Sequence, residues 1–165
     1  MEDIRSNLEA VGKRIEEAAE ACGRNPEEVL LVAVSKTRTP EEINTAIDAG
    51  ATDIGENKVQ EIMDKFDAIK PVRWHMIGHL QTNKVKYSRD KVDMIHSVDS
   101  MKLAQEIDKR AGQHGKVMDI LVQINPAEEE SKFGVTIDDA GALVREILYT
   151  CENIIIRGLM SVAPI

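Results

Sequence analysis

The 165 residues are enough for one domain with a hydrophobic core, because domains usually run to about 100–200 residues. The formal net charge of −8 argues against nonspecific binding to nucleic acid or anionic lipid, which needs basic patches. No apolar run approaches the ~20 residues of a membrane span, and the acidic start at Met1-Glu2-Asp3 is unlike a signal peptide. Cys22 and Cys151 have no metal-like or redox-like spacing, so a reducing, cytoplasmic setting is expected.

The apolar pattern predicts one initial helix, over residues 4–22, and then alternating strands and helices. The continuous apolar run at 29–34 is typical of a strand buried on both faces. Thr39 and Pro40 then open a helix that reaches Ala49. Further strands are predicted at 52–55, 73–77, 92–98, 117–124 and 154–160, and further helices at 59–66, 82–87, 100–111 and 137–149.

Repeated β-α units predict a parallel sheet with right-handed crossovers, and no linker divides residues 1–165. Two α/β architectures fit this pattern, an open doubly wound sheet and a barrel. No glycine-rich phosphate loop follows the first strand, as a dinucleotide-binding fold requires. The preferred prediction is therefore a TIM-type (β/α)8 barrel, truncated here after about six strands, with an extra N-terminal helix.

Polar residues follow most of the predicted strands. In parallel α/β folds, ligands bind at the carboxyl ends of the strands, so this shared position predicts a binding site. In chain order, the residues are Ser35-Lys36, Gly55-Glu56-Asn57, those from His75 to His79, Ser97, Asn125 and Met160-Ser161.

Lys36 has two interpretations from the residues alone. A lysine at the inner end of a strand loses solvation free energy unless it is paired or used chemically. Desolvation favours the neutral amine, which attacks carbonyl groups. The alternative is that the side chain extends into solvent and keeps its charge there.

The histidines are equally open to two interpretations. His75 alternates with Trp74 and Met76, so one side of its strand is polar or faces a ligand. A structural hydrogen bond to a neighbouring strand explains His75 equally well, and His96 has the same two interpretations. The sequence has neither an HExxH spacing nor a GxSxG motif, so we expect no metal site and assign no catalytic residue.

Six segments together are similar to one known family. They are residues 32–37 (VAVSKT), 55–61 (GENKVQE), 74–84 (WHMIGHLQTNK), 96–99 (HSVD), 130–134 (ESKFG) and 157–160 (RGLM). On these segments the chain resembles the pyridoxal phosphate homeostasis proteins, also called the YggS or PROSC family. The resemblance runs from about residue 30 to residue 163 and implies a fold like the barrel domain of alanine racemase.

The resemblance also implies a bound pyridoxal 5′-phosphate. It implies that Lys36 forms the Schiff base, that Asn57 lies close to the cofactor ring, and that His75 and Ile77 line the pocket. These roles come from matching motifs in the family, position by position.

Three further positions follow from the same resemblance. Lys132 matches a cation near the Schiff base, and Met160 and Ser161 match a strand that packs against one face of the ring. In the family, the segments that hold the phosphate and an arginine at the pyridine nitrogen come after the sixth strand. These 165 residues do not contain those segments, so we expect the cofactor to be held mainly through the covalent bond.

Three functions remain to be weighed. The preferred one is a monomeric carrier that buffers pyridoxal phosphate and passes it to apo-enzymes, without its own turnover and without nucleic-acid or membrane partners. The second is an amino-acid racemase, which needs bases on both faces of the Schiff base. The two tyrosines, Tyr87 and Tyr149, do not follow predicted strands and so do not supply the second base. The third is a cofactor-independent Schiff-base aldolase, which needs an acid/base partner for the lysine.

Overall fold

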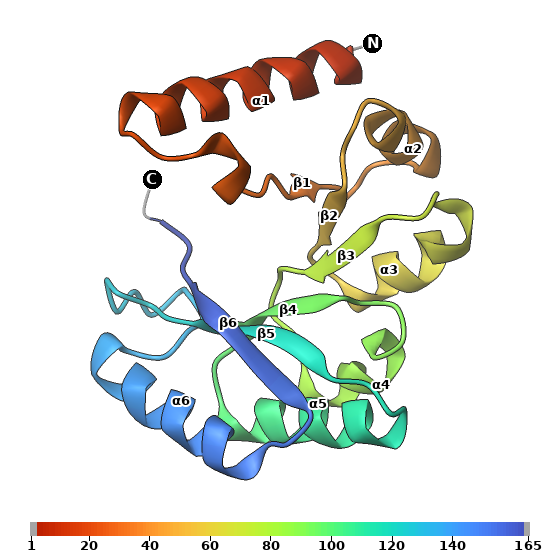
Figure 1. Ribbon diagram of the computed structural model, residues 1–165. Coiled ribbons are helices and arrows are strands. Elements are labelled where there is room, and N and C mark those ends of the chain that lie inside the picture. Colours follow the sequence, from red (N-terminus) through yellow and green to blue (C-terminus); the bar gives the residue numbers. More distant parts are fainter. Residues whose placement is uncertain (1–2, 164–165) are drawn as a thin grey trace.

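Helix α1 (Ile4–Ala21) opens the chain and six strands follow it (Figure 1). This computed structural model describes residues 3–163. The strands are β1 (Ala33–Val34), β2 (Asp53–Glu56), β3 (Arg73–Met76), β4 (Met94–Val98), β5 (Met118–Gln123) and β6 (Ile154–Met160). The helices between them are α2 (Pro40–Asp48), α3 (Val59–Lys65), α4 (Val85–Ser88), α5 (Met101–Gln113) and α6 (Ile137–Thr150).

Local sequence signals set several helix starts. The hydroxyl of Thr39 accepts the backbone N–H of Glu42, and the Glu42 carboxylate accepts the N–H of Thr39, which completes a capping box at α2. Ser100 and Thr136 cap α5 and α6 more simply: each hydroxyl oxygen accepts one backbone N–H, that of Leu103 and of Asp139. These caps satisfy backbone donors that the helices themselves leave free.

The six strands form one parallel sheet in the order β1-β2-β3-β4-β5-β6. This confirms the predicted alternation of strands and helices and the predicted parallel pairing of the strands. The first strand is much shorter than predicted, because only Ala33 and Val34 pair with β2, opposite Ile54 and Gly55. Within residues 3–163, β1 and β6 are the edge strands.

The two faces of the sheet differ in chemistry. The face that packs against the helices is mostly apolar: its central members Ile54, Met76 and Ile120 are almost fully buried, and Glu56 at the end of β2 is its buried acid. The opposite face alternates with it and includes Asp53 and His75. In a barrel this second face is the lumen, so the polar residues gather inside the curve of the sheet.

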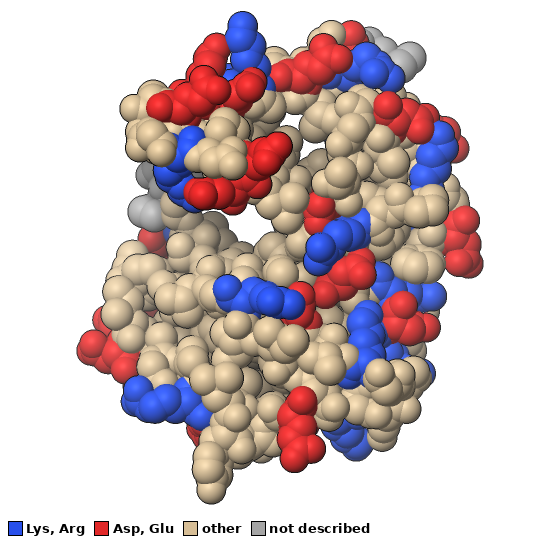
Figure 2. All heavy atoms as spheres, in the orientation of Figure 1, with Lys and Arg blue, Asp and Glu red and all other residues tan. Residues whose placement is uncertain are grey.

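Helix α1 stands away from the sheet (Figure 1), and residues of α1, β1 and α2 line a groove of about 890 Å³. Leu8, Val11 and Val34 lie among the apolar residues that line it. Figure 2 shows the molecule hollowed below α1. Across residues 3–163, no helix has the length and apolarity needed to cross a membrane.

Candidate functional site

The carboxyl ends of the six parallel strands share one edge of the sheet. The predicted site residues Lys36, Asn57 and Ile77 come within two residues of the ends of β1, β2 and β3. Met160 ends β6, and Ser161 follows it. Parallel pairing therefore brings residues from distant parts of the sequence to the same end of the fold.

Lys36 follows the buried Ser35 and is itself exposed. The Ser35 hydroxyl lies 2.7 Å from Glu56 Oε1 and 3.1 Å from the carbonyl oxygen of Gly55, which ties the end of β1 to β2. The exposure of Lys36 agrees with the interpretation in which its side chain reaches solvent. It also leaves the amine open to a dissolved aldehyde.

A chain of hydrogen bonds runs along the lumen face of the sheet from β2 through β3 to β4. Asp53 Oδ1 lies 2.7 Å from His75 Nε2, and His75 Nδ1 lies 2.7 Å from His96 Nε2. With Asp53 ionised, His75 Nε2 donates to its carboxylate. The proton between His75 Nδ1 and His96 Nε2 then links β3 to β4.

Burial and neighbouring charges shift the pKa values of Asp53 and His96, the two ends of this chain. Burial raises the pKa of Asp53, but hydrogen bonds from His75 and Thr52 and the charge of Arg73 leave it below its usual value. Burial, with a smaller contribution from the charge of His75, lowers the pKa of His96 to about 4. His96 is therefore neutral at pH 7.

We expect acid to destabilise the fold through His96 before it reaches Asp53. His96 takes up a proton near pH 6.5 in the unfolded chain but only near pH 4 in the folded protein. The unfolded state therefore binds more protons in that window, and the free energy of unfolding falls by on the order of 2–3 kcal/mol as pH drops from 6.5 to 4. Urea unfolding of the parent and of His96→Gln at pH 7 and pH 4.5 measures this. Equal pH dependence in both proteins would contradict it.

The loops after β2 and β3 pack directly on one another. The backbone of Asn57 lies against Gly78, so close that a Cβ atom at position 78 would approach Asn57 Cα to 2.7 Å. Ile77 lies over Gly55, where a Cβ would meet its Cδ1 atom at 3.1 Å. Because the two glycines have no Cβ atom, the loops pack closely and Asn57 and Ile77 lie at the carboxyl edge of the sheet, which we call the mouth.

Lys132 lies in the loop between β5 and α6, and its Nζ is 3.2 Å from Glu129 Oε1. Phe133 stacks on His79 from the loop after β3, with ring centroids 3.7 Å apart. The backbone N–H of Gly134 donates to Asp99 at 3.3 Å, which adds the loop after β4. Three loops that are far apart in sequence are thereby joined over the mouth of the sheet.

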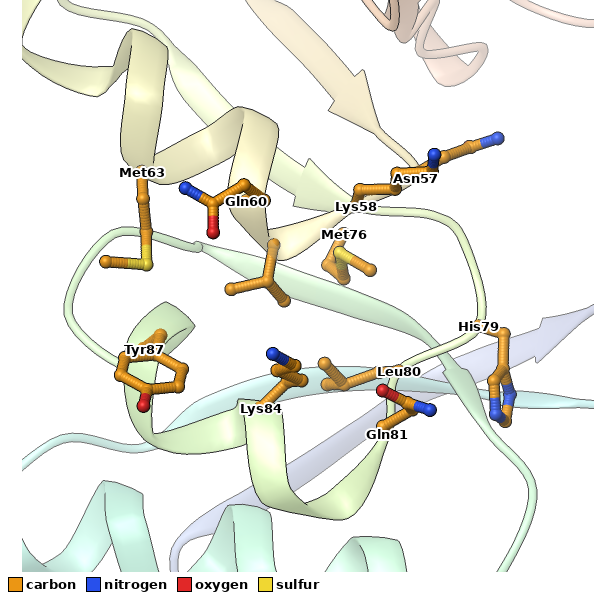
Figure 3. A pocket seen from close by; sticks show the side chains of 11 residues that line it. Asn57, Lys58, Gln60, Met63, Met76, His79, Leu80, Gln81, Lys84 and Tyr87 are labelled. Carbon is orange, nitrogen blue, oxygen red and sulfur yellow. The ribbon is translucent and has the colours of Figure 1, made fainter.

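A cavity of about 530 Å³ lies between α3 and α4, beside the mouth (Figure 3). Met63, Met76 and Leu80 give it an apolar floor, while Asn57 and His79 form its boundary with the loops just described. Lys36 does not line this cavity. The cavity is on the helix side of the sheet, whereas the chain of histidines is in the lumen.

Comparisons with known proteins identify the family. The sequence profile described as alanine racemase, N-terminal domain, matches residues 6–164. The pyridoxal phosphate homeostasis protein of Aquifex aeolicus is 42% identical over 161 residues, covering 95% of this chain and 69% of the relative. The protein of the same name from Escherichia coli is 37% identical over 170 residues, covering 98% and 71%. The chain belongs to the pyridoxal phosphate homeostasis family.

Solved structures agree with this family and with its predicted barrel-type fold. An unknown protein from Bifidobacterium adolescentis, 35% identical, superposes with a TM-score of 0.90 and covers 99% of this chain and 72% of its own. PipY of Synechococcus elongatus, solved with pyridoxal phosphate bound, is 34% identical with a TM-score of 0.77, covering 91% and 70%. Alanine racemase of Clostridium difficile, at 15% identity and a TM-score of 0.74, shares the fold.

The sequence did not single out several residues that organise this site. Asp53 anchors the chain of histidines, and Glu61 and Lys65 reach from α3 to the backbone around Lys36. The acid and base at positions 61 and 65 look like an ordinary exposed helix pair in the sequence. Only the position of α3 beside the end of β1 gives them a further role.

Proposed function

We propose that this protein holds pyridoxal 5′-phosphate as a Schiff base on Lys36 and carries it to other enzymes without its own turnover. The observation that supports this most is the place of Lys36, exposed at the carboxyl edge of a parallel sheet. PipY, which was solved with pyridoxal phosphate bound, matches 91% of this chain and gives independent support. Residues 1–165 then form a single unit for binding the cofactor.

The covalent step needs an accessible neutral amine and an aldehyde. The Lys36 nitrogen adds to the aldehyde carbon, a C–N bond forms, and the aldehyde oxygen leaves as water. Transfer of the imine to another amine reverses the attachment and frees Lys36. A single lysine therefore suffices for carrying the cofactor.

The surrounding residues suit an aromatic ring with polar substituents. In the proposed site, Asn57 and Ile77 contact the ring, since both are half-buried where the β2 and β3 loops meet. His75 is only 1% exposed and both its nitrogens are occupied. It therefore acts on the cofactor through the neutral ring of His96.

The far side of the proposed site comes from the last two strands. Met160 is half-buried, and its carbonyl oxygen accepts the backbone N–H of Ile124 at 2.8 Å. Met160 and Ser161 then cover one face of the ring. Lys132 is held by Glu129 in the loop over the mouth and supplies a positive charge near the Schiff base.

The absence of turnover is part of the proposal. A racemase needs a base on each face of the Schiff base. Tyr87 lies in α4 beside the cavity of Figure 3, and Tyr149 is 92% exposed near the end of α6, so neither supplies a second base at the mouth. The proposed carrier works as a monomer in the cytoplasm, where its free cysteines stay reduced, and delivers to apo-enzymes.

The test is a titration with pyridoxal 5′-phosphate, read by visible absorbance and by borohydride reduction followed by peptide mapping. We expect a yellow adduct that borohydride fixes on Lys36, and no adduct in Lys36→Ala. Lys70→Ala, which removes an exposed lysine paired with Asp48, is the matched control and should leave the adduct unchanged. Adduct formation in Lys36→Ala equal to the parent would disprove the assignment, and exchange of an amino acid's α-hydrogen with solvent deuterium would disprove the absence of turnover.

A further inference from the structure

The backbone around Lys36 is held in an uncommon conformation. The N–H of Arg38 donates to the carbonyl oxygen of Ser35 at 3.2 Å, which closes a four-residue turn with Lys36 and Thr37 at its centre. Thr37 has a φ of 62°, in the left-handed region. In β-turns a positive φ at the third residue belongs to type II, where glycine or asparagine is usual, and it is unfavourable for a β-branched residue.

A side chain of α3 fixes the central peptide of this turn. The backbone N–H of Thr37 donates to Glu61 Oε2 at 2.8 Å. A type I turn over the same four residues would place Thr37 at negative φ and rotate the Lys36–Thr37 peptide, so that this N–H would point away from Glu61. The hydrogen bond therefore selects the left-handed conformation of Thr37.

Lys65 ties the same turn to the sheet. Its ammonium lies 3.1 Å from the Ser35 carbonyl oxygen, 3.0 Å from Glu56 Oε1 and 2.7 Å from Glu61 Oε2. Its pKa is raised even though burial lowers it, because Glu61 and Glu56 both favour the charged form. We call Ser35, Glu56, Glu61 and Lys65 the Lys65 cluster.

Burying the charged groups of the Lys65 cluster costs desolvation free energy, so the cluster adds little net stability to the fold. Glu56 is fully buried, and within residues 3–163 its Oε2 atom has no hydrogen-bond partner. Buried ion pairs are often no more stabilising than apolar residues of the same size, and an unsatisfied carboxylate oxygen adds a further cost. Strained backbone next to a candidate reactive residue is typical of a position that serves function.

We infer that Glu61 and Lys65 are positioning residues for Lys36: they hold the turn from Ser35 to Arg38 in the conformation that directs the lysine to the cofactor. This inference rests on the proposed function, because it assumes that Lys36 forms the Schiff base. Glu61 acts through the Thr37 peptide, and Lys65 acts through Glu61 and the Ser35 carbonyl. Neither side chain touches the cofactor.

The test compares Glu61→Ala with Asp64→Ala, which removes an exposed acid of the same helix whose carboxylate accepts from Gln60. We expect Glu61→Ala to weaken pyridoxal 5′-phosphate binding about tenfold, and Asp64→Ala to change it less than about twofold. Thr37→Gly in the Glu61→Ala background should restore most of the affinity, because glycine adopts the left-handed conformation without strain. A merely structural loss of α3 contacts would not be rescued by glycine at position 37.

Hydrogen exchange separates this inference from the proposed function. The Thr37 amide should be protected in the parent and exchange faster in Glu61→Ala, whether or not cofactor is present. An unprotected Thr37 amide in the parent, unchanged affinity in Glu61→Ala, or no rescue by Thr37→Gly would each overturn the positioning role while Lys36 still forms the adduct. A parent protein that forms no adduct on Lys36 would overturn the proposed function, and this inference with it.

Discussion

Replacing Gly78 with alanine should destabilise the protein by about 3 kcal/mol, because the added methyl group has no room. An ideal Cβ at this position would lie 2.7 Å from Asn57 Cα and 2.9 Å from its carbonyl carbon, and closer still to its carbonyl oxygen. These are backbone atoms, so relief requires the loops after β2 and β3 to move apart. Urea unfolding gives the loss of stability, and cofactor titration should show weaker binding because Asn57 moves.

Gly12→Ala is the matched control for this substitution. Gly12 lies in α1, and a Cβ there meets nothing within 4 Å. Alanine favours the helix over glycine, so the free energy of unfolding should rise by about 0.5–1 kcal/mol. A Gly78→Ala variant as stable as the parent would contradict the close packing of the β2 and β3 loops described above.

Asp53→Ala should also cost about 3 kcal/mol, because it leaves a buried donor without an acceptor. Asp53 is 2% exposed and accepts from His75 Nε2 at 2.7 Å and from the Thr52 hydroxyl at 2.7 Å. Its carboxylate also lies 3.6 Å from Arg73 Nε. Without Asp53, the buried His75 loses the acceptor for its Nε2 proton, and the hydrogen-bonded chain to His96 loses its anchor on β2.

Two further variants separate the buried interaction from the loss of a charge. Asp53→Asn keeps an oxygen acceptor for His75, so its unfolding free energy should lie between those of the parent and Asp53→Ala. Asp48→Ala removes an aspartate of the exposed pair with Lys70, in which both side chains are about half exposed, and should cost less than about 1 kcal/mol. Equal losses for Asp53→Ala and Asp48→Ala would mean that the chain of histidines adds nothing to stability.

Gly78→Ala and Asp53→Ala also test the proposed site, each at a different place. Gly78→Ala shifts a loop at the mouth, while Asp53→Ala changes the protonation pattern deep in the lumen. If the cofactor contacts the lumen through His96, as proposed, Asp53→Ala should shift the pH dependence of adduct formation. Titration of the adduct between pH 5 and 8 measures this shift against the parent.

Sequence patterns predicted the elements well where the cause is local. Capping residues such as Thr39 and Ser100 act within three residues, so the starts of α2 and α5 could be placed directly. The apolar run at 29–34 also placed Lys36 correctly just after the first strand. The predicted length of that strand was wrong, because strand length depends on how many residues pair with the neighbouring strand, here only two.

The sequence by itself determined the order of helices and strands, their parallel pairing, and a polar edge that includes Lys36, because hydrophobic periodicity and helix caps act over a few residues. The tertiary structure alone decided how polar groups meet across that sheet. Asp53 and His75 are 22 residues apart and meet because the register pairs Gly55 with His75, which puts all three on one face. Lys65 reaches Ser35 across 30 residues because α3 packs on β2, the strand that pairs with β1. Such contacts depend on register and helix packing, which no short segment of the chain encodes on its own.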